Sequence, residues 1–285
     1  MLKGLAFLAP WLAGFCIFML LPIALSLYYS FCDYSLLQPP VWAGLRNYEE
    51  LFADEVFWRT LRNTGWYAAM ALPAGLLVAL GLALLLNVPT PGQGIYRTII
   101  FLPSLIPIVA SAMLWLWLFN ARLGLINAGL GLLGVNGPGW LTDPRWAMPA
   151  LAFMSLWSVG HTVVIYLAGL QDVPRQLYEA AAIDGATGWR RLWHVTLPML
   201  SPVIFFNLIM AIIATLQVFA VPYIMTNGGP GRATYFYTMY LYDNAFTYLK
   251  MGYASAMAWV QLLIILALTA LAFWSARRWV HYEMS

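Results

Sequence analysis

The sequence predicts an all-α protein, a polytopic membrane helical bundle with six transmembrane helices in one domain over residues 1–285. The chain is 62% hydrophobic and only 9% charged, whereas an ordinary soluble domain carries about 25% charged residues. Such a chain has too few charged side chains to cover a water-exposed surface. Six apolar runs reach the length of about 20 residues that a helix needs to cross the hydrocarbon core. None of these runs contains Asp, Glu, Lys or Arg.

The predicted spans lie, in chain order, at 5–29, 66–86, 98–120, 147–170, 200–225 and 252–274. The first is too long for the apolar region of a signal peptide, and no small-residue cleavage site follows it, so we expect it to remain as a spanning helix. Prolines recur inside the spans, at Pro22, Pro73, Pro103, Pro107, Pro149, Pro202 and Pro222. They indicate either ordinary kinks in a packed bundle or a solvated pathway that satisfies the freed backbone groups.

Five connections join the spans, and they differ in kind. Residues 30–65, 121–146 and 226–251 are long or irregular and contain turn signals, which are Gln38-Pro39-Pro40, Asn136-Gly137-Pro138-Gly139 and Asn227-Gly228-Gly229-Pro230-Gly231. Residues 87–97 form a short loop with two prolines and a glycine. Residues 171–199 are polar but favour helix, because three successive alanines lie between two candidate amphipathic turns.

Six spans place both chain ends on the same side as the connections 87–97 and 171–199. Lys and Arg accumulate in cytoplasmic loops, but the two sides carry seven such residues each. The pair Arg277–Arg278 directly follows the last span and favours a cytoplasmic C-terminus. Charge alone therefore gives only a weak preference for cytoplasmic termini.

The connection 171–199 predicts two short helices joined by a bend. Pro174 and Ala180–Ala182 favour the first helix, since proline presets φ at a helix start and alanine has the highest helix propensity. Gly185 can adopt the positive φ that ends a helix and redirects the chain. The second helical stretch runs from about Thr187 to Thr196, after which Pro198 opens the fifth span. Two such helices on a membrane surface indicate a docking element for a cytoplasmic protein.

This pattern resembles the Glu-Ala-Ala loop of ATP-binding-cassette (ABC) importer permeases. The residues that we assign to it are Glu179, Ala180, Ala181, Asp184, Gly185, Leu197 and Pro198, and Val195 stands where isoleucine is commoner. The resemblance implies a coupling helix that sits in a cleft of an ATPase subunit. It also implies that this loop and both termini are cytoplasmic, in a multi-pass protein of a bacterial inner membrane. The alternative, an amphipathic surface helix without a partner, leaves the spacing unexplained.

Other segments resemble the first membrane subunit of maltose and glycerol-3-phosphate importers, a branch of the sugar permeases. They are Trp42–Tyr48, Phe101–Pro107, Gly124–Asn127, Thr226–Pro230 and Arg278–Tyr282. The chain departs from that pattern at its start, where only Lys3 precedes the first span. The resemblance implies four partners beside the lipid bilayer: a second homologous permease, two ATPase subunits and an extracytoplasmic solute-binding protein. It implies a transport subunit that binds no cofactor, with ATP and Mg on the ATPase subunits.

A pathway for a sugar needs hydrogen-bonding groups beside aromatic faces, and polar side chains in spans tend to face the bundle interior. The candidates are Trp157, Ser158, His161, Thr215, Gln217 and Tyr223. We expect Ser158, His161 and Thr162 to share one helix face, because they follow i, i+3, i+4 spacing. The maltose-type resemblance implies that Ser158, His161, Thr215 and Gln217 lie in or beside the sugar site. Hydrogen bonds between helices are the alternative role for such residues.

Several other classes of function fit the sequence poorly. An ion-coupled secondary transporter is the main alternative, but it would normally bury carboxylates or histidine chains, and the spans contain only His161. An enzyme, a metal site and nucleic-acid binding lack the residue clusters that they need. Without a Gly-x-x-x-x-Gly-Lys-Ser/Thr loop, the chain has no phosphate cradle of that type for ATP. The spans also lack Lys and Arg, which favours a neutral sugar or oligosaccharide over a phosphorylated one.

Overall fold

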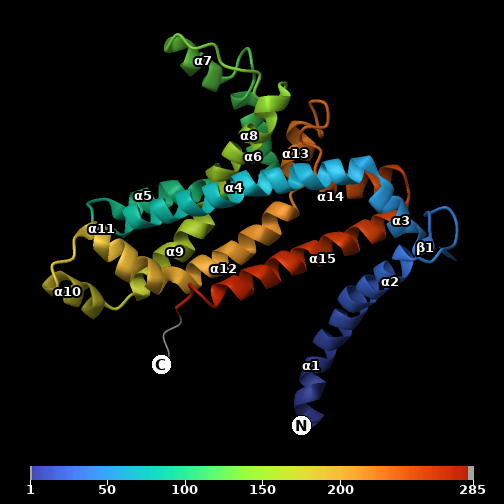
Figure 1. Cartoon of the computed structure of the whole chain (residues 1–285), viewed down its shortest axis with the longest axis horizontal. Helices are drawn as coiled ribbons and strands as arrows, with labels where there is room; N and C mark the ends of the chain where they lie inside the picture. Colours follow the sequence, from blue (N-terminus) through green and yellow to red (C-terminus); the bar gives the residue numbers. More distant parts are fainter. Residues whose placement is uncertain (1, 282–285) are drawn as a thin grey trace. The chain divides into compact units, whose positions relative to one another are not determined.

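The computed structural model describes residues 2–281, with side chains from residue 8 onwards, and this part of the chain is helical almost throughout (Figure 1). Its only sheet consists of two strands of two residues each, β1 (Cys32–Asp33) and β2 (Val41–Trp42), paired antiparallel with Cys32 opposite Trp42. The chain forms two compact units, one made of residues up to Leu61 with Tyr237–Leu266 and one made of Arg62–Phe236 with the residues from Ala267 onwards. The expected single domain over residues 1–285 stays a prediction.

The first unit packs its helices around an aromatic core. Its elements are α1 (Leu2–Phe15), a π-helical turn (Cys16–Leu20), α2 (Leu21–Ser30), the two strands, α3 (Arg46–Ala53), the start of α4 (Glu55–Asn87), α14 (Tyr237–Tyr242), a second π-helical turn (Asp243–Thr247) and most of α15 (Met251–Ala276). Leu51, Phe57, Tyr237 and Met257 are buried in one cluster there, contributed by α3, α4, α14 and α15.

The second unit contains the remaining helices. They are α5 (Gln93–Phe101), a 3₁₀ turn (Leu102–Leu105), α6 (Ile108–Leu118), α7 (Leu125–Leu132), α8 (Pro144–Ser155), a 3₁₀ turn (Leu156–Ser158), α9 (Gly160–Asp172), α10 (Arg175–Ile183), α11 (Gly188–Arg191), a π-helical turn (Leu192–Thr196), α12 (Leu197–Leu216) and α13 (Ala220–Met225). One core of this unit brings α4, α9 and α12 together around Ala83, Tyr166 and Leu200. A smaller core joins Phe205 of α12 to Ala272 and Ala276 at the end of α15.

Four of the six predicted spans fall within single candidate spanning segments, of which Gly188–Met225 is interrupted at residues 217–219. They occupy Leu8–Ser30, Glu55–Asn87, Gly188–Met225 and Met251–Ala276. The other two are bent pairs, Gln93–Leu105 with Ile108–Leu118 and Pro144–Ser158 with Gly160–Asp172, bent by 98° and 49°. Counting each bent pair as one span gives six candidate spans, of which the third and fourth are broken rather than straight.

The break in the third span has a direct cause in the chain. Ile106 is extended, with φ −73° and ψ 130°, and it precedes Pro107, which starts α6. A residue before proline is pushed out of the helical region, and proline supplies no N–H for a helical hydrogen bond. The helix therefore stops at Leu105 and restarts in a new direction at Ile108.

Candidate functional site

The Glu-Ala-Ala stretch ends its helix in a Schellman motif. Asp184 is the first non-helical residue after α10, and Gly185 follows it with φ +74°. The N–H of Ala186 donates to the carbonyl of Ala181 at 2.8 Å, and the N–H of Gly185 donates to that of Ala182 at 3.1 Å. This pair of bonds requires the left-handed conformation that glycine adopts at no steric cost. The positive φ expected at Gly185 is confirmed.

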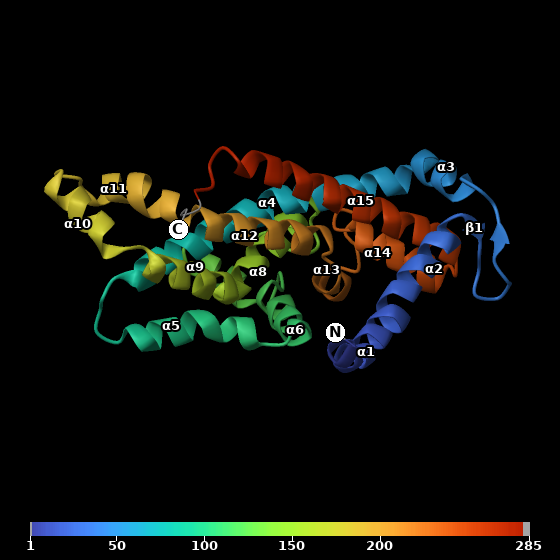
Figure 2. The ribbon, with the colours of Figure 1, turned by 90° about the horizontal axis from the view of Figure 1, so that it is seen from below.

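The second helix of this loop runs without interruption into the fifth span. α11 continues through the π-helical turn Leu192–Thr196 into α12, so the segment from Gly188 onwards is helical up to Leu216. The N–H of Leu197 bonds back five residues to Leu192, one residue before Pro198. Proline has no N–H and cannot donate the next helical hydrogen bond. The wider π-helical turn just before Pro198 accommodates this missing bond. Figure 2 shows α10 and α11 folded against each other at the end of α12 that is remote from α13.

A hydrogen bond that sequence reasoning did not predict closes this loop. The hydroxyls of Tyr178 in α10 and Thr196 in the π-helical turn lie 3.0 Å apart. Thr196 is buried, whereas its neighbours Trp193 and His194 are exposed. The bond joins residues 18 positions apart, so no local spacing rule indicates it. The bond ties α10 to the π-helical turn that leads into α12.

The two short helices expose both charge and apolar surface. Glu179 and Asp184 are exposed on the first helix and its end. Large apolar side chains of these helices and the following π-helical turn are also exposed, Leu177 at 38%, Ile183 at 87%, Trp189 at 69% and Trp193 at 55%. The two tryptophans pack edge to face with ring centroids 5.9 Å apart. An exposed apolar group beside charged residues is typical of a surface that docks a partner.

Three of the six predicted pathway residues gather where the fourth span breaks. Trp157 and Ser158 belong to the 3₁₀ turn before the break, and His161 lies in the first turn of α9 after it. The His161 ring is exposed and lies against Phe101, with ring centroids 5.2 Å apart. Trp157 meets Trp115 edge to face at 5.8 Å. One polar group here, His161, thus lies against an aromatic ring, the combination that we expect of a sugar pathway.

The expectation that Ser158, His161 and Thr162 share one helix face is wrong. The chain bends by 49° between Pro144–Ser158 and Gly160–Asp172, so the i, i+3, i+4 relation does not hold across Val159. The Ser158 hydroxyl points back to the carbonyl of Ser155 at 3.4 Å. Only His161 and Thr162 lie on the same helix, α9.

The two broken spans contact each other through Gly160. A Cβ atom placed on Gly160 would lie 2.9 Å from both the carbonyl oxygen of Ile100 and Oγ of Ser104, and 3.0 Å from Cα of Phe101. Only a glycine allows the backbones of α5 and α9 to approach this closely. Discontinuous helices that meet inside a membrane protein commonly line a substrate pathway.

The other three pathway candidates occupy the end of the fifth span. Thr215 donates its hydroxyl proton to the carbonyl of Ala211 at 2.7 Å within α12. Gln217 is exposed just after α12, where the helix breaks before α13. Tyr223 in α13 stacks on Phe219 with centroids 5.1 Å apart. The packing neighbour of α13 is α6, so the helix that carries Tyr223 lies beside the second half of the third span.

Residues of two other motifs stabilise the connections in which they lie. In 30–65, the Asn47 amide donates to the carbonyls of Ser30 and Cys32 at 2.9 and 2.8 Å, which anchors α3 to the end of α2. In 121–146, the Asn127 amide donates to Ala121 and Pro138 and accepts from Trp140. These asparagines satisfy backbone groups of irregular chain, so their role in the motifs is structural.

Among the residues that the structure describes, no group of three or more His, Cys, Asp or Glu side chains could hold a metal ion. The two free cysteines differ in their surroundings, since Cys16 is exposed and Cys32 is buried.

A family model described as binding-protein-dependent transport system inner membrane component matches residues 71–281. The chain is 42% identical to the probable ABC transporter permease protein YesP of Bacillus subtilis, over 99% of this chain and 93% of the relative. It is 37% identical to the lactose transport system permease protein LacF of Rhizobium radiobacter, over 96% of this chain and 94% of that relative. The structure is similar to a subunit of a bacterial ABC transporter that imports the acidic polysaccharide alginate, with a TM-score of 0.86, 27% identity, and coverage of 97% of this chain and 95% of that chain.

Proposed function

The chain belongs to the family of binding-protein-dependent transport system inner membrane components, among the sugar permeases of ABC transporters, and on this premise we propose that it carries a neutral carbohydrate into the cytoplasm. It is a transport subunit with several membrane-spanning helices and not an enzyme. The proposal concerns the direction of transport, the charge of the substrate and the partners that drive it.

The helix pair Arg175–Ile183 and Gly188–Arg191 carries the proposal. Its glycine-ended first helix exposes Glu179 and Asp184, and its second helix is continuous with the fifth span. A partner that moves the loop therefore acts directly on a spanning helix. We assign this partner to an ATPase subunit, with a basic group facing Glu179. The loop and both termini then lie in the cytoplasm.

The complete transporter in this proposal has four kinds of component. A second homologous permease forms the pathway together with this chain, two ATPase subunits bind ATP and Mg, and an extracytoplasmic solute-binding protein delivers the sugar. Support for the last component comes from a solved alginate ABC transporter in complex with an alginate-pentasaccharide-bound periplasmic protein, which this chain resembles with a TM-score of 0.86 and 26% identity. ATP must bind the inward-facing and outward-facing states with different affinity to switch them.

The substrate class follows from the chemistry of the spans. The names of relatives include neutral sugars, lactose and trehalose/maltose, and charged substrates, sulfoquinovosyl glycerol and sn-glycerol 3-phosphate, so the proposed neutral charge rests on this chain's own spans. No Asp, Glu, Lys or Arg lies in the six predicted spans, so no fixed charge there would pair with a charged substrate. Trp157, His161 and Phe101 at the break of the fourth span supply aromatic and hydrogen-bonding groups for a neutral ring.

The experiment that tests this function is co-purification of an ATPase with the detergent-solubilised chain, compared with the variants Glu179→Ala, Gly185→Val and Gly188→Val. Gly185→Val forces a β-branched residue into a positive φ, which costs of order 1–3 kcal/mol and should distort the docking helix. We expect native chain to recover the ATPase, and both Glu179→Ala and Gly185→Val to recover less.

Gly188→Val is the matched control. Gly188 is exposed in the same loop, and like Gly185 it has no atom within 4 Å of a built Cβ, but its φ is not positive. We expect this variant to recover the ATPase as the native chain does. Equal recovery for Gly185→Val and Gly188→Val would refute the role of the bend. Recovery of the native chain without any ATPase, after solubilisation under mild conditions, would contradict the proposed function.

A further inference from the structure

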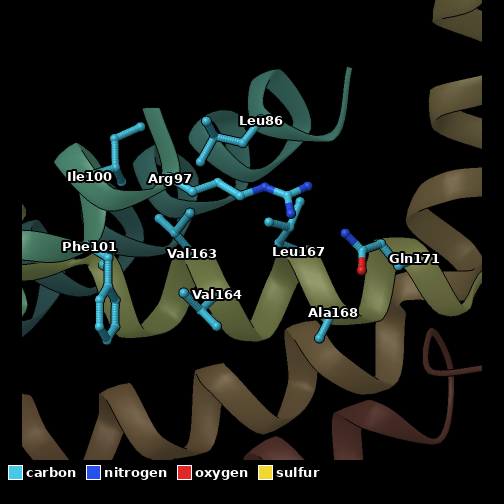
Figure 3. Close-up of a pocket in the computed structure, with 10 residues that line it drawn as sticks. Leu86, Arg97, Ile100, Phe101, Val163, Val164, Leu167, Ala168 and Gln171 are labelled. Atoms are coloured by element: carbon cyan, nitrogen blue, oxygen red, sulfur yellow. The ribbon is translucent and has the colours of Figure 1, made fainter. Parts of the chain in front are cut away.

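A small pocket in the second unit combines apolar walls with one arginine. Its volume is about 270 Å³, and it lies between the end of α4, helix α5 and helix α9 (Figure 3). Leu86, Ile100, Val163 and Leu167 line it with hydrocarbon. Its polar side chains are those of Arg97 and Gln171.

Arg97 has no anionic partner among the residues that the structure describes. The salt bridges found in this part of the chain both belong to Arg46. Moreover, Nε of Arg97 is buried and makes no hydrogen bond. A buried donor without a partner costs roughly 1–3 kcal/mol, and more for a charged group. The guanidinium of Arg97 therefore has a buried donor that no group in the described part of this chain satisfies.

The pocket lies at the level where three spans begin or end. Leu86 is the last residue of the second predicted span, Arg97 directly precedes the third, and Gln171 directly follows the fourth. The polar groups are thus at the membrane–water boundary, and the apolar walls extend from there along the spans. Figure 3 shows the Arg97 side chain crossing the pocket above Leu167, toward the end of α9 where Gln171 lies.

We propose that this pocket binds the phosphate of a membrane phospholipid, with an acyl chain along its apolar walls. A guanidinium presents paired N–H donors that match phosphate oxygens. Basic pockets between spanning helices at a membrane surface are suited to lipid headgroups. Exposed apolar side chains continue from the pocket on both helices, Ile99 on α5 and Val164 on α9, and they extend the surface along which lipid tails lie.

A free anion fits the pocket less well than a lipid does. Inorganic phosphate would satisfy Arg97 but would make no contact with the hydrocarbon walls. A carboxylate from a neighbouring subunit would need to reach a group at the membrane boundary. The lipid satisfies the charge and the apolar walls together, because its phosphate and its hydrocarbon are joined at this same boundary.

The test is native mass spectrometry of the full-length chain assembled with its partner subunits, titrated with phosphatidylglycerol. We expect Arg97→Gln to reduce lipid binding about fivefold, the effect of one basic residue near a membrane surface. Arg97→Lys should retain part of the binding, since it keeps the charge but not the paired donors. The matched control is Arg277→Gln, an exposed arginine at the end of the last span, which should leave binding unchanged.

Two further arms separate the possible occupants. Val164→Trp fills an exposed wall of the pocket and leaves Arg97 in place, so it should weaken the lipid but not inorganic phosphate. Inorganic phosphate added in excess should fail to displace the lipid. Displacement by phosphate, or equal losses in Arg97→Gln and Arg277→Gln, would overturn the proposal. So would a cross-link from Arg97→Cys to a neighbouring subunit in an assembly that holds no lipid.

Discussion

Asp54 illustrates how one residue organises the first unit. It lies between α3 and α4, accepts hydrogen bonds from the hydroxyls of Tyr240 and Tyr253, and accepts one from the N–H of Val56 at 2.8 Å. Burial by itself raises the pKa of Asp54, but these hydrogen bonds to the charged form outweigh it and hold the pKa below its ordinary value of 3.8. The ionised carboxylate therefore joins the start of α4 to α14 and α15.

The lowered pKa of Asp54 predicts a loss of stability in acid. The pKa of Asp54 is lower in the folded protein than in the unfolded chain, so the ionised carboxylate stabilises the fold. This stabilisation is complete above pH 3.8 and is lost as the pH falls through the folded pKa. At neutral pH we expect Asp54→Asn to destabilise the protein by about 1 kcal/mol. This is the energy of a hydrogen bond to a charged group, reduced because Asp54 is partly exposed to solvent. Thermal unfolding followed from pH 7 downwards should show the variant and the native chain converging in acid.

The matched control for this prediction is Asp33→Asn. Asp33 lies in the same unit and its side chain is 73% exposed, with a single ion pair at 3.9 Å. Exposed pairs of this kind contribute little, so the variant should unfold like the native chain at every pH. A constant difference between Asp54→Asn and native protein across the whole pH range would contradict the assignment.

His161 is the one histidine within the predicted spans, and its exposed ring lies against Phe101. If it donates or accepts a hydrogen bond to the sugar, His161→Ala should raise the KM of uptake about fivefold, the effect of losing roughly one hydrogen bond. Uptake of labelled substrate by the assembled transporter measures this change. His281→Ala alters an exposed histidine outside the spans and should leave KM unchanged. An unaltered KM in His161→Ala would assign the ring to packing alone.

At the scale of elements, the two broken spans depend on the contact at Gly160. We expect Gly160→Ala to destabilise the bundle by about 1–3 kcal/mol, because the new methyl group overlaps backbone atoms of α5 that cannot rotate away. The measurement is the melting temperature and yield of the solubilised protein. Gly81→Ala is the control, since Gly81 lies inside α4 with no atom within 4 Å of a built Cβ. If both variants melt alike, the close approach of α5 and α9 is not required.

The elements that could be predicted well from the sequence are those determined by the residue types within one short segment. Spans of about 20 apolar residues without charge can fold in lipid only as helices, and the positive φ at Gly185 follows from the one residue type that favours it. Periodicity could not reveal the bend at Val159, because hydropathy carries no information on direction. The strand pair at Cys32–Trp42 was missed, since two residues per strand give no alternating pattern.

The candidate site was predicted unevenly for the same reason. The coupling loop is continuous in sequence, so its helix, bend and second helix could be derived in order. The Tyr178–Thr196 bond and the unpartnered Arg97 depend on tertiary packing and left no signal in spacing. Ser158 was expected to share a helix face with His161 because the i, i+3, i+4 spacing was applied across the bend between Ser158 and Gly160. The roles of Glu179 and of the pathway residues stay predictions.

At the scale of the whole molecule, the distribution of charge determines which energy source can drive transport. Ion-coupled carriers move protons or sodium through buried ionisable groups, and the six predicted spans contain no Asp, Glu, Lys or Arg. The exposed charges near the fifth span lie instead on the coupling loop, at Glu179, Asp184 and Arg190. Under the proposed function, we expect the energy to enter through that surface from a separate ATPase.

This reasoning predicts that uptake requires ATP and does not require an ion gradient. The measurement uses proteoliposomes that contain the chain, its second permease and the ATPase subunits, with the solute-binding protein outside and ATP inside. Uptake should fall to background without ATP or with an ATPase variant that cannot hydrolyse it. A protonophore or a sodium ionophore should leave the rate unchanged, because the predicted spans contain no carboxylate and only one histidine, His161, to carry the ion. Uptake that survives without ATP and stops when the gradient is dissipated would mean that the coupling loop does not drive transport.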